Sequence, residues 1–471
     1  MESIIRTLPS YLRMLAGASP KKMLLGDSAG WLNASQASER VDAIAHFLVQ
    51  SGICCGDFVA LRTYRNVKAA LVLLALQAIG AVAVLIDPRQ NVSELLSKND
   101  PPISVSNIID PNTLDVPSVI SCPFPAQQID PQTPGFIIFT SGSTGAPKAV
   151  MLSQHNLIAN LIDSKPLGGY SEDDIALGAL PLDHVFGLVL LAGVAVLGYG
   201  IYFPKKTDVP SLLQTIESQK ITRMNGVPSL YLTMAAQAES YDISSLRCGF
   251  VGGAPCTQAQ ICHIEEKLSM TLIPVYGMSE CIGISCADYQ QPRSLRAAGV
   301  GSVYSMTECR ICHEDGTEAA VGEIGEIYVR GSARMIGYYP NLLPPEHYYQ
   351  TGDLGYLDQE GILHLTGRKK DIIIRNGNNL SVRKIEDALL SINVVSDAAV
   401  VGIPDDICGE VPVGMIVCPD NSLRSIWIQL HALLQKNEIP KELFRVQALP
   451  KTAVGKPDKQ RIREVLMKWK V

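Results

Sequence analysis

Short apolar runs alternate with longer apolar stretches over roughly residues 20–300. Segment 57–64 reads DFVALRTY, segment 66–80 reads NVKAALVLLALQAIG, and segment 81–87 reads AVAVLID. This alternation is typical of βαβ units, in which helices cover both faces of a sheet. The first part of the chain is therefore predicted to be an α/β domain built on helix-covered β-sheets.

The pattern changes near residue 300 to short strands and tight turns, as in 322–331 (GEIGEIYVRG) and 354–367 (LGYLDQEGILHLTG). Antiparallel hairpins of a β-barrel-like subdomain are expected there. After the charged run 367–371 (GRKKD), two strands and helices near Ser381, Ile426 and Asp458 predict a small α+β domain. A charged run between two compact patterns favours a boundary, so the predicted domains are 1–369 and 370–471.

Composition excludes several classes of function. The 471 residues are 47% hydrophobic, with a net charge of −6, so no basic surplus favours nucleic acid. Glu2, Arg6 and Arg13 interrupt the N-terminal segment, which does not resemble a secretory signal, and a cytoplasmic location is expected. Two uncharged stretches, 69–86 and 187–203, approach membrane-span length, but both contain Gly, and the first continues into a strand pattern. No membrane span is predicted.

The twelve cysteines are scattered, as expected of reduced thiols. Cys309, Cys312 and His313 spell the C-x-x-C-H pattern of haem attachment. They lie in an alternating run that ends at an Asp315-Gly316 turn, so we interpret them as strand residues and expect neither haem nor metal there.

A polar loop follows the apolar run 136–139. It contains Ser141, Gly142, Ser143, Thr144, Gly145 and Lys148. Hydroxyls and bare backbone amides can donate many hydrogen bonds to phosphate oxygens, while the lysine adds charge. The spacing is not that of a P-loop, and an isolated Ser/Gly loop is more often an ordinary solvated turn. We expect the loop to lie between a strand and a helix.

Three further polar segments interrupt the apolar background. Tyr276 ends a predicted strand, where an aromatic ring can stack on a base, and Glu280 lies in an almost uncharged run that suits Mg²⁺. Asp353, in a Gly-containing turn, has two oxygens for the hydroxyls of a ribose, and Lys456 lies on a Gly-Lys-Pro loop. Individually, each is more simply a turn residue or a solvated charge.

Together these segments resemble, in order, the motifs of the adenylate-forming acyl-activating superfamily of acyl-CoA synthetases, peptide-synthetase adenylation domains and firefly luciferase. The resemblance covers nearly the whole chain. The matching stretches are FTSGSTGAPKAV (139–150), PLDHVFGL (181–188), GGAP (252–255), YGMSE (276–280), GEIGEIYVRG (322–331), TGDLG (351–355), GRKKDIIIRNG (367–377) and PKTAVGK (450–456).

The resemblance implies that a carboxylic acid attacks the α-phosphate of ATP to give an acyl adenylate and pyrophosphate, and that the thiol of CoA then takes the acyl group. It implies ATP, Mg²⁺ and CoA, or a phosphopantetheine arm, as cofactors. The implied nucleotide-binding residues are Ser141, Gly142, Ser143, Thr144, Gly145, Lys148, Gly252, Gly253, Ala254, Tyr276, Gly277, Met278, Ser279, Asp353, Arg368 and Lys456.

The same resemblance assigns catalysis to Thr144, Lys148, Glu280 and Lys456, with Glu280 as the metal ligand. A C-terminal domain that swings about a hinge at Lys370 would bring Lys456 to the phosphates for adenylation and withdraw it for thiol transfer. No cysteine is required as a nucleophile.

The substrate is predicted to be a small aryl or aliphatic carboxylic acid without an α-amino group. By alignment, Val185 stands near the position where amino-acid-activating members carry an Asp, although Asp183 is close, and an ammonium against Val would be costly to desolvate. The expected pocket residues are His184, Val185, Phe186, Val251, Gly252, Met278, Cys281 and Ile282. His184 resembles a histidine beside the acyl pocket of the ligases, and a core histidine is the alternative.

The chain departs from the family pattern at Ala149, where Gly is usual, at Asn378 for Glu and at Val382 for Pro. The last two lie near the expected thiolation face, so the acceptor stays open. A free-standing enzyme that loads an acyl or aryl carrier protein is the first alternative. A non-catalytic nucleotide-binding regulator is the second.

Overall fold

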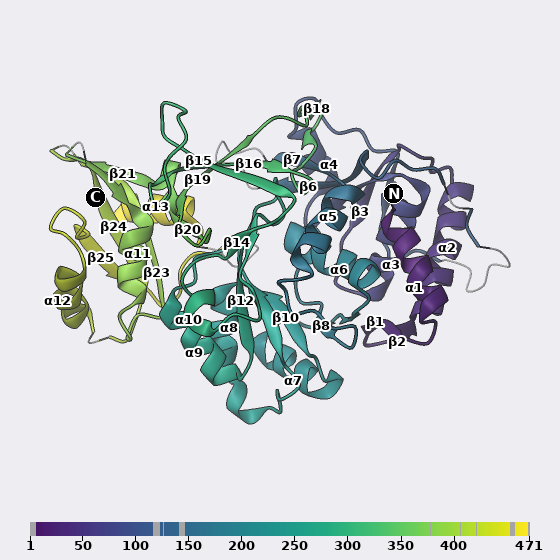
Figure 1. The fold of residues 1–471 in the computed structure, drawn as a ribbon, viewed down its shortest axis with the longest axis horizontal. Helices are drawn as coiled ribbons and strands as arrows, with labels where there is room; N and C mark the ends of the chain where they lie inside the picture. The colour runs from purple at the N-terminus through teal and green to yellow at the C-terminus, as the bar shows by residue number, and fades with distance from the viewer. Residues whose placement is uncertain are drawn as a thin grey trace.

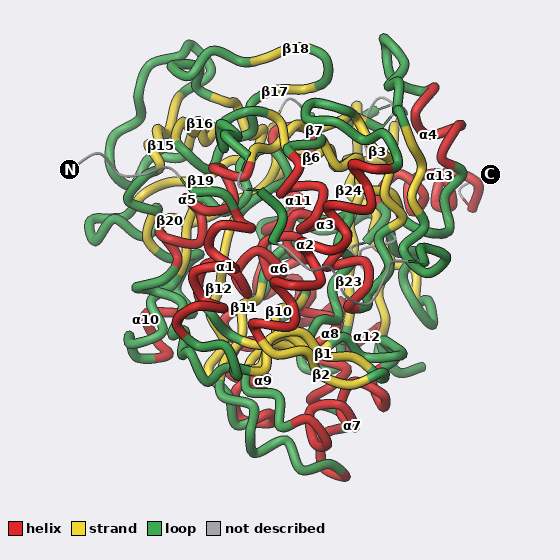
Figure 2. Tube along the Cα trace, turned by 90° about the vertical axis from the view of Figure 1, so that its right-hand side faces the viewer, coloured by secondary structure: helices red, strands yellow, loops and turns green. Residues whose placement is uncertain are grey.

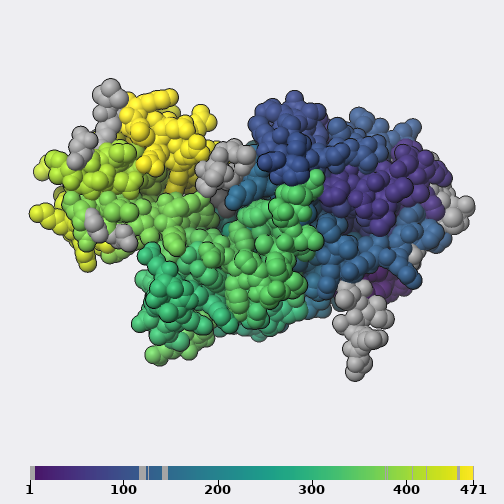
Figure 3. All heavy atoms as spheres, turned by 90° about the horizontal axis from the view of Figure 1, so that it is seen from above, coloured from purple at the N-terminus to yellow at the C-terminus, as the bar shows by residue number. Residues whose placement is uncertain are grey.

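The structure is a computed structural model that describes residues 6–115, 123–125, 127–140, 147–376, 378–405, 407–420, 422–452 and 457–469. The strands in these ranges form four sheets. The C-terminal part of the chain lies at one end of the molecule, and the N-terminal helices lie at the other (Figure 1). A second view shows the C-terminal part as a separate lobe (Figure 3).

The first large sheet has seven strands in the order β18-β17-β7-β6-β4-β3-β5. Its strands are β3 (Phe58–Arg62), β4 (Val82–Ile86), β5 (Asn107–Ile109), β6 (Pro134–Thr140), β7 (Lys148–Ser153), β17 (Gly337–Tyr338) and β18 (Asn341–Leu342). The accompanying helices are α1 (Leu8–Ala18), α2 (Ala34–Gln50), α3 (Val67–Ile79), α4 (Val92–Ser97), α5 (Gln154–Ser164) and α6 (Val185–Leu197).

The second large sheet has nine strands in the order β14-β13-β12-β11-β10-β8-β9-β1-β2. Its strands are β1 (Met23–Asp27), β2 (Gly30–Asn33), β8 (Ile175–Leu177), β9 (Gly200–Tyr202), β10 (Arg223–Gly226), β11 (Cys248–Val251), β12 (Thr271–Tyr276), β13 (Ser285–Cys286) and β14 (Ser302–Val303). The helices on this part of the chain are α7 (Val209–Gln219), α8 (Pro228–Ala235), η1 (Ala238–Ser240), α9 (Gln258–Leu268) and α10 (Arg293–Arg296).

The main core lies between the two large sheets. It is formed by α1, α2, α3, α5 and α6 together with buried side chains from strands of both sheets, and these helices gather at the centre of Figure 2. Helix α3 is buried at every position except Lys68, as expected for a helix that is apolar all round. Its ends are marked by the Asn66 side chain, which accepts from the Ala69 N–H, and by Gly80 in the left-handed region.

A four-stranded antiparallel sheet joins this body to the C-terminal domain. It contains β15 (Thr307–Cys312), β16 (Gly325–Gly331), β19 (Tyr349–Leu357) and β20 (Leu363–Arg368), and it ends at η2 (Lys369–Asp371). The C-terminal sheet contains β21 (Ile372–Arg375), β22 (Asn378–Ser381), β23 (Asp397–Asp405), β24 (Gly409–Val417) and β25 (Glu442–Arg445), with helices α11 (Val382–Leu390), α12 (Leu423–Leu433) and α13 (Lys459–Trp469).

The α/β fold class predicted from the apolar pattern is confirmed. Segments 57–64, 66–80 and 81–87 form β3, α3 and β4, in which β3 and β4 are parallel, and 322–331 and 354–367 form antiparallel strands. Stretch 69–86 is a buried helix followed by a strand, and no helix in the described ranges has the length and apolar character of a membrane span.

The C-x-x-C-H segment is a strand, as predicted. Cys309 and Cys312 lie on β15, which pairs with β16, and the ring of His313 faces the Glu323 carboxylate at 3.3 Å. Within the described residues, no group of three His, Cys, Asp or Glu side chains is arranged to hold a metal ion.

A buried ion cluster joins the amino ends of three parallel strands of the nine-stranded sheet. The Asp174 carboxylate precedes β8 and pairs with Arg223 of β10 at 3.1 Å and with Arg247, next to β11, at 2.8 Å. Arg223 is fully buried and lies 3.9 Å from the centre of the Tyr170 ring. A buried charge without a partner is costly, so Arg223 depends on Asp174 at the end of the sheet away from the strand carboxyl termini.

We expect Asp174→Asn to destabilise the protein by about 3–5 kcal/mol, because it leaves the buried Arg223 without its counterion. The neighbouring Asp173 is exposed, so Asp173→Asn is the matched control and should change little. Thermal unfolding of both variants followed by circular dichroism measures the difference. Equal unfolding temperatures would show that the cluster contributes no stability.

Candidate active site

The candidate site lies at the carboxyl ends of β11 and β12. These strands run parallel in the nine-stranded sheet and end at Val251 and Tyr276. Ligands of open α/β sheets bind outside the carboxyl ends of the strands. Val251, Gly253, Ala254, Tyr276 and Gly277 all line one cleft at this edge.

Asp353 connects three elements of this site. Its carboxylate accepts a hydrogen bond from the Tyr276 hydroxyl at 2.8 Å and another from Arg368 Nε at 2.8 Å. Asp353 is 6% exposed and Tyr276 7%, and burial, followed by the nearby Asp353, raises the pKa of the Tyr276 phenol. The structure therefore brings together three of the residues predicted to hold adenosine.

Two glycines let the backbone approach closely beside these strands. A Cβ on Gly252 would lie 2.8 Å from a methyl group of Val275, and one on Gly277 would overlap the carbonyl of Ile282. The turn after Tyr276 is closed by the Ile284 N–H, which donates to the Tyr276 carbonyl at 2.8 Å. Within it Ile282 has φ +49°, a strained conformation for a β-branched residue. Met278 and Ser279 are half-buried in this turn.

Glu280 is buried next to a pair of tyrosines. The Tyr338 hydroxyl donates to Glu280 Oε1 at 2.7 Å and lies 2.9 Å from the Tyr349 hydroxyl. Lys148, the first residue of β7, places its ammonium 5.1 Å from the centre of the Tyr338 ring. Glu280 therefore contacts the hydroxyl, and Lys148 the ring, of the same tyrosine.

The residues around Glu280 fit Mg²⁺ held jointly with a nucleotide. Mg²⁺ keeps several waters and is usually held by one or two carboxylates together with substrate phosphates. In the part of the chain that the structure describes, no cluster of three acidic, His or Cys side chains forms a complete metal cage. A single carboxylate oriented by the Tyr338 phenol fits an ion whose other ligands are phosphates and water.

The expected loop–helix order after β6 is wrong. Residues 148–153 form strand β7, which pairs with both β6 and β17, and the helix begins only at Gln154. A short apolar run does not distinguish a strand from the start of a buried helix by periodicity alone. Five predicted residues of this loop, Ser141, Gly142, Ser143, Thr144 and Gly145, lie outside the described residues.

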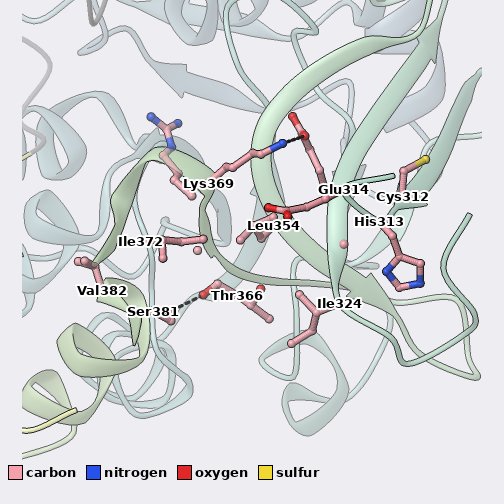
Figure 4. Close-up of a pocket in the computed structure, with 14 residues that line it drawn as sticks. Cys312, His313, Glu314, Ile324, Leu354, Thr366, Lys369, Ile372, Ser381 and Val382 are labelled. Carbon is pink, nitrogen blue, oxygen red and sulfur yellow. Dashed lines mark hydrogen bonds and ion pairs between the residues drawn. The ribbon is translucent and has the colours of Figure 1, made fainter. Parts of the chain in front are cut away.

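The predicted hinge lies between the four-stranded sheet and the C-terminal domain. Lys369 Nζ lies 3.1 Å from Glu326 Oε2 of β16, and the Ser381 hydroxyl donates to the Thr366 carbonyl at 2.7 Å. Both bonds are drawn around the pocket in Figure 4, whose walls come from both sides of residue 370. Lys370 itself lines the cleft described above.

Residues 453–456, which include Lys456, also lie outside the described residues, whereas Thr452 and Pro457 on either side of them are described. Lys451 and Pro457 form an isolated antiparallel bridge, and Thr452 and Pro457 line the same cleft as Tyr276, Asp353 and Arg368. The segment that contains Lys456 is therefore attached beside the cleft that contains the predicted nucleotide residues.

The predicted acid-pocket residues divide among neighbouring clusters. Val251 lines the cleft, whereas Val185, Cys281 and Ile282 are buried in the core. His184 caps helix α6, where its Nδ1 accepts from the Phe186 N–H at 3.3 Å. His184 directly precedes the apolar run that forms α6, and this position was the signal for a helix cap that the sequence analysis missed.

The departures from the family pattern are accommodated locally. Val382 is the first residue of α11, a position that Pro also favours, and the Ser381 side chain accepts from the Lys384 N–H to cap the helix. Ala149 is 2% exposed in β7. Asn378 begins β22 and is exposed.

Sequence reasoning also missed Tyr338, Tyr349 and Lys459. Tyr338 contacts the predicted Glu280 although 58 positions separate them, Tyr349 contacts Tyr338, and Lys459 contacts Asp371, which follows the predicted hinge. Lys459 Nζ lies 3.3 Å from Asp371 Oδ2 and 3.2 Å from Glu386 Oε1. A short local motif carries no signal for such partners.

Comparison with known proteins agrees with the fold and the motifs. The model of the AMP-binding enzyme family matches residues 13–97 and 96–339, and the model of the AMP-binding enzyme C-terminal domain matches 384–456. A 2-succinylbenzoate–CoA ligase from Bacillus cereus is 29% identical over 98% of this chain and 99% of its own.

Two solved structures are similar in fold. One is ATP-bound MatB from Rhodopseudomonas palustris, with a TM-score of 0.86, 24% identity, and coverage of 98% of this chain and 99% of that one. The other is the o-succinylbenzoate CoA synthetase MenE from Bacillus subtilis in complex with the acyl-adenylate OSB-AMP, with a TM-score of 0.84, 24% identity and the same coverage. The chain belongs to the AMP-binding enzyme family, and it is an adenylate-forming enzyme whose relatives are acid–thiol ligases.

Proposed function

We propose that this enzyme joins a carboxylic acid to ATP, releases pyrophosphate, and transfers the resulting acyl group to the thiol of CoA. The observation that carries the proposal is the cleft itself. It is lined by Tyr276, Asp353 and Arg368 from the large domain and by Thr452 and Pro457, which flank the Lys456 segment of the C-terminal domain. Residues of both predicted domains thus line one cleft.

The division of roles follows from charge. A carboxylate must approach the α-phosphate of a polyanion, so the site has to supply positive charge where negative charge accumulates. We assign this task to Lys456 and Lys148. Mg²⁺, held by Glu280, would neutralise phosphate charge when bound.

Adenosine is assigned to the residues that Asp353 connects. We propose that the Tyr276 ring stacks on adenine and that Asp353 and Arg368 bind the ribose hydroxyls. The fixed position of the Tyr276 phenol supports this, because the hydrogen bond to Asp353 fixes the orientation of the ring. The backbone of Gly252, Gly253 and Ala254 forms the neighbouring wall, and the phosphates are assigned to 141–145.

The acid is proposed to be aryl or aliphatic without an α-amino group. Asp183, the carboxylate nearest the expected ammonium position, accepts a hydrogen bond from the Thr63 hydroxyl at 3.2 Å, and burial raises its pKa. Both features weaken it as a partner for a substrate ammonium. Among the relatives, one is named for 2-succinylbenzoate, an acid without an amino group, and CoA is the acceptor in that name.

Acid-dependent exchange of pyrophosphate into ATP tests the function. Aryl acids, short, medium and long aliphatic acids and amino acids are compared, followed by free CoA and pantetheinylated carrier protein as acceptors. We expect exchange with an acid that lacks an amino group, and thioester formation with CoA. Absence of exchange across the whole panel would refute the proposal.

Lys456→Ala should lower adenylation by at least about a hundredfold, because a cation at the reacting phosphate is lost. Thioester formation from supplied acyl adenylate should stay near the wild-type rate, since that step does not use Lys456. Quenched assays of the two half-reactions measure both rates. Lys468→Ala, which changes an exposed lysine of the same domain, is the control. Equal losses in both half-reactions would refute the division of roles.

Tyr338→Phe should raise the Mg²⁺ concentration needed for half-maximal exchange by about 10- to 100-fold, because it removes the hydrogen bond that orients Glu280. The ring that faces Lys148 is retained. Tyr349→Phe removes the hydroxyl that contacts the Tyr338 hydroxyl. It is the matched control and should raise the Mg²⁺ requirement less. An unchanged Mg²⁺ requirement in Tyr338→Phe would argue against Glu280 as the metal ligand.

A further inference from the structure

Four buried polar side chains lie along one face of helix α5. They are spaced at intervals of three and four residues, and none is more than 6% exposed: Asn156, Asn160, Asp163 and Ser164. The Asn160 amide reaches the turn 277–284, where its Nδ2 lies 3.4 Å from the Gly283 carbonyl oxygen. This turn follows Tyr276 and contains Glu280, so α5 lies directly beside the candidate site.

Three of the four side chains have hydrogen bonds that account for their burial. Asn156 donates to the Ser332 carbonyl at 2.7 Å, and its amide oxygen takes part in the cap of α5. Asp163 accepts from a hydroxyl and from an N–H of the segment 305–306. Ser164 donates to a carbonyl of its own helix at 3.1 Å. These three groups are therefore satisfied within the protein.

Asn160 is the exception. A side-chain amide has two N–H donors and a carbonyl oxygen that accepts. Within the described residues, the Asn160 amide makes one hydrogen bond, to Gly283, and its length of 3.4 Å exceeds the usual range of about 2.7–3.2 Å. Buried polar groups normally have partners, so a buried amide with unused capacity needs an explanation. Its carbonyl oxygen and its second N–H are available to a bound molecule.

The surroundings of Asn160 are those expected of the acid pocket. A Cβ on Gly283 would lie 2.5 Å from Asn160 Nδ2 and 2.7 Å from Tyr304 Cε2, so both side chains lie against this glycine. Tyr304 is 4% exposed and packs in one cluster with Phe186, a predicted pocket residue. Helix α6, which begins at Val185, contacts α5 (Figure 1). Asn160 therefore borders the elements that carry the predicted pocket residues.

The charges near Asn160 favour a neutral ligand group. Neither α5 nor the turn 277–284 contains Lys or Arg, whereas Asp163 and Glu280 each contribute a carboxylate. A second carboxylate on the acid would have no cation to pair with there, and an unpaired ion is costly in a buried site. A hydroxyl group can both donate and accept, so it matches an amide with an unused N–H and an unused carbonyl oxygen.

We propose that Asn160 is a specificity-determining residue that binds a neutral hydroxyl group on the carboxylic acid substrate. The inference rests on the proposed function, since that function places an acid in this pocket. It narrows the substrate to an aryl or short aliphatic hydroxy acid whose hydroxyl lies away from the reacting carboxylate. Tyr304 lies directly behind Gly283 and limits the space for a longer acid.

A hydroxyl preference of this kind has a clear physical origin. When an acid lacks the hydroxyl, the buried groups that would bind it are left without partners, and the cost appears in transition-state binding. We expect kcat/KM for the preferred hydroxy acid to exceed that for its parent acid by at least about tenfold.

The test compares wild type with Asn160→Leu and Asn160→Ala. Leucine has the same branching at Cγ as asparagine but no hydrogen-bonding atoms, and alanine adds no bulk if leucine prevents folding. The matched control is Ser164→Ala, which removes a polar group from the same face of α5. The probes are benzoate, 3-phenylpropanoate and hexanoate, each with its monohydroxy derivatives. Acid-dependent pyrophosphate exchange gives kcat/KM, equilibrium dialysis of the labelled acids gives Kd, and circular dichroism gives the unfolding temperature.

We expect wild type and Ser164→Ala to prefer one hydroxy acid over its parent by at least about tenfold, both in kcat/KM and in Kd. In Asn160→Leu and Asn160→Ala this ratio should fall to about one, mainly through loss of activity and binding with the hydroxy acid. The ratio compares two acids on the same protein, so a general structural defect lowers both values and leaves the ratio unchanged.

The assignment would be overturned if wild type bound no hydroxy acid better than its parent, or if the preference survived in both Asn160 variants. A surviving preference together with a lower unfolding temperature would make Asn160 a structural residue only.

Failure of this inference is distinguishable from failure of the proposed function. If no acid supported pyrophosphate exchange, the proposed function would be refuted, yet the ratio of Kd values would still decide the role of Asn160. Normal exchange without a hydroxyl preference would remove only the role of Asn160.

Discussion

The site depends on one buried carboxylate. Asp353 accepts hydrogen bonds from the Tyr276 phenol, at the end of β12, and from the Arg368 guanidinium, at the end of β20. It therefore connects the nine-stranded sheet to the four-stranded sheet. A carboxylate with 6% exposure is costly unless it is paired, and here both oxygens have a donor. Arg368, one of these donors, lies two residues before Lys370, so the same contact that shapes the candidate nucleotide subsite also supports the strand that leads to the hinge.

The proposed mechanism gives a reason for a chain divided into two domains. The large domain presents aromatic, acidic and glycine residues at the carboxyl ends of parallel strands, whereas the Lys456 segment extends from a small domain with its own core. A cation on a separate body, attached through a short hinge, can serve the first step and leave before the second.

The extent of prediction from the sequence follows the range of the interactions. The regular βαβ alternation identified β3, α3 and β4, because the local spacing of apolar residues reflects burial on one or both faces. The same reasoning misplaced the helix after Lys148, since strand β7 is held between β6, its neighbour in the sequence, and β17, which lies far along the chain. Tyr338 beside Glu280, and Lys459 beside Asp371, depend on the tertiary fold in the same way, and only recognition of family motifs brought Tyr276, Asp353 and Arg368 together in advance.

In the proposed reaction a carboxylate oxygen of the acid attacks the α-phosphate of ATP, and the thiol later cleaves the bond between that oxygen and the acyl carbon. Turnover with a carboxylic acid labelled with ¹⁸O in both carboxyl oxygens tests this directly. Mass spectrometry of the products should show one labelled oxygen in AMP and none in pyrophosphate. Unlabelled AMP, or formation of ADP together with labelled phosphate, would contradict the account.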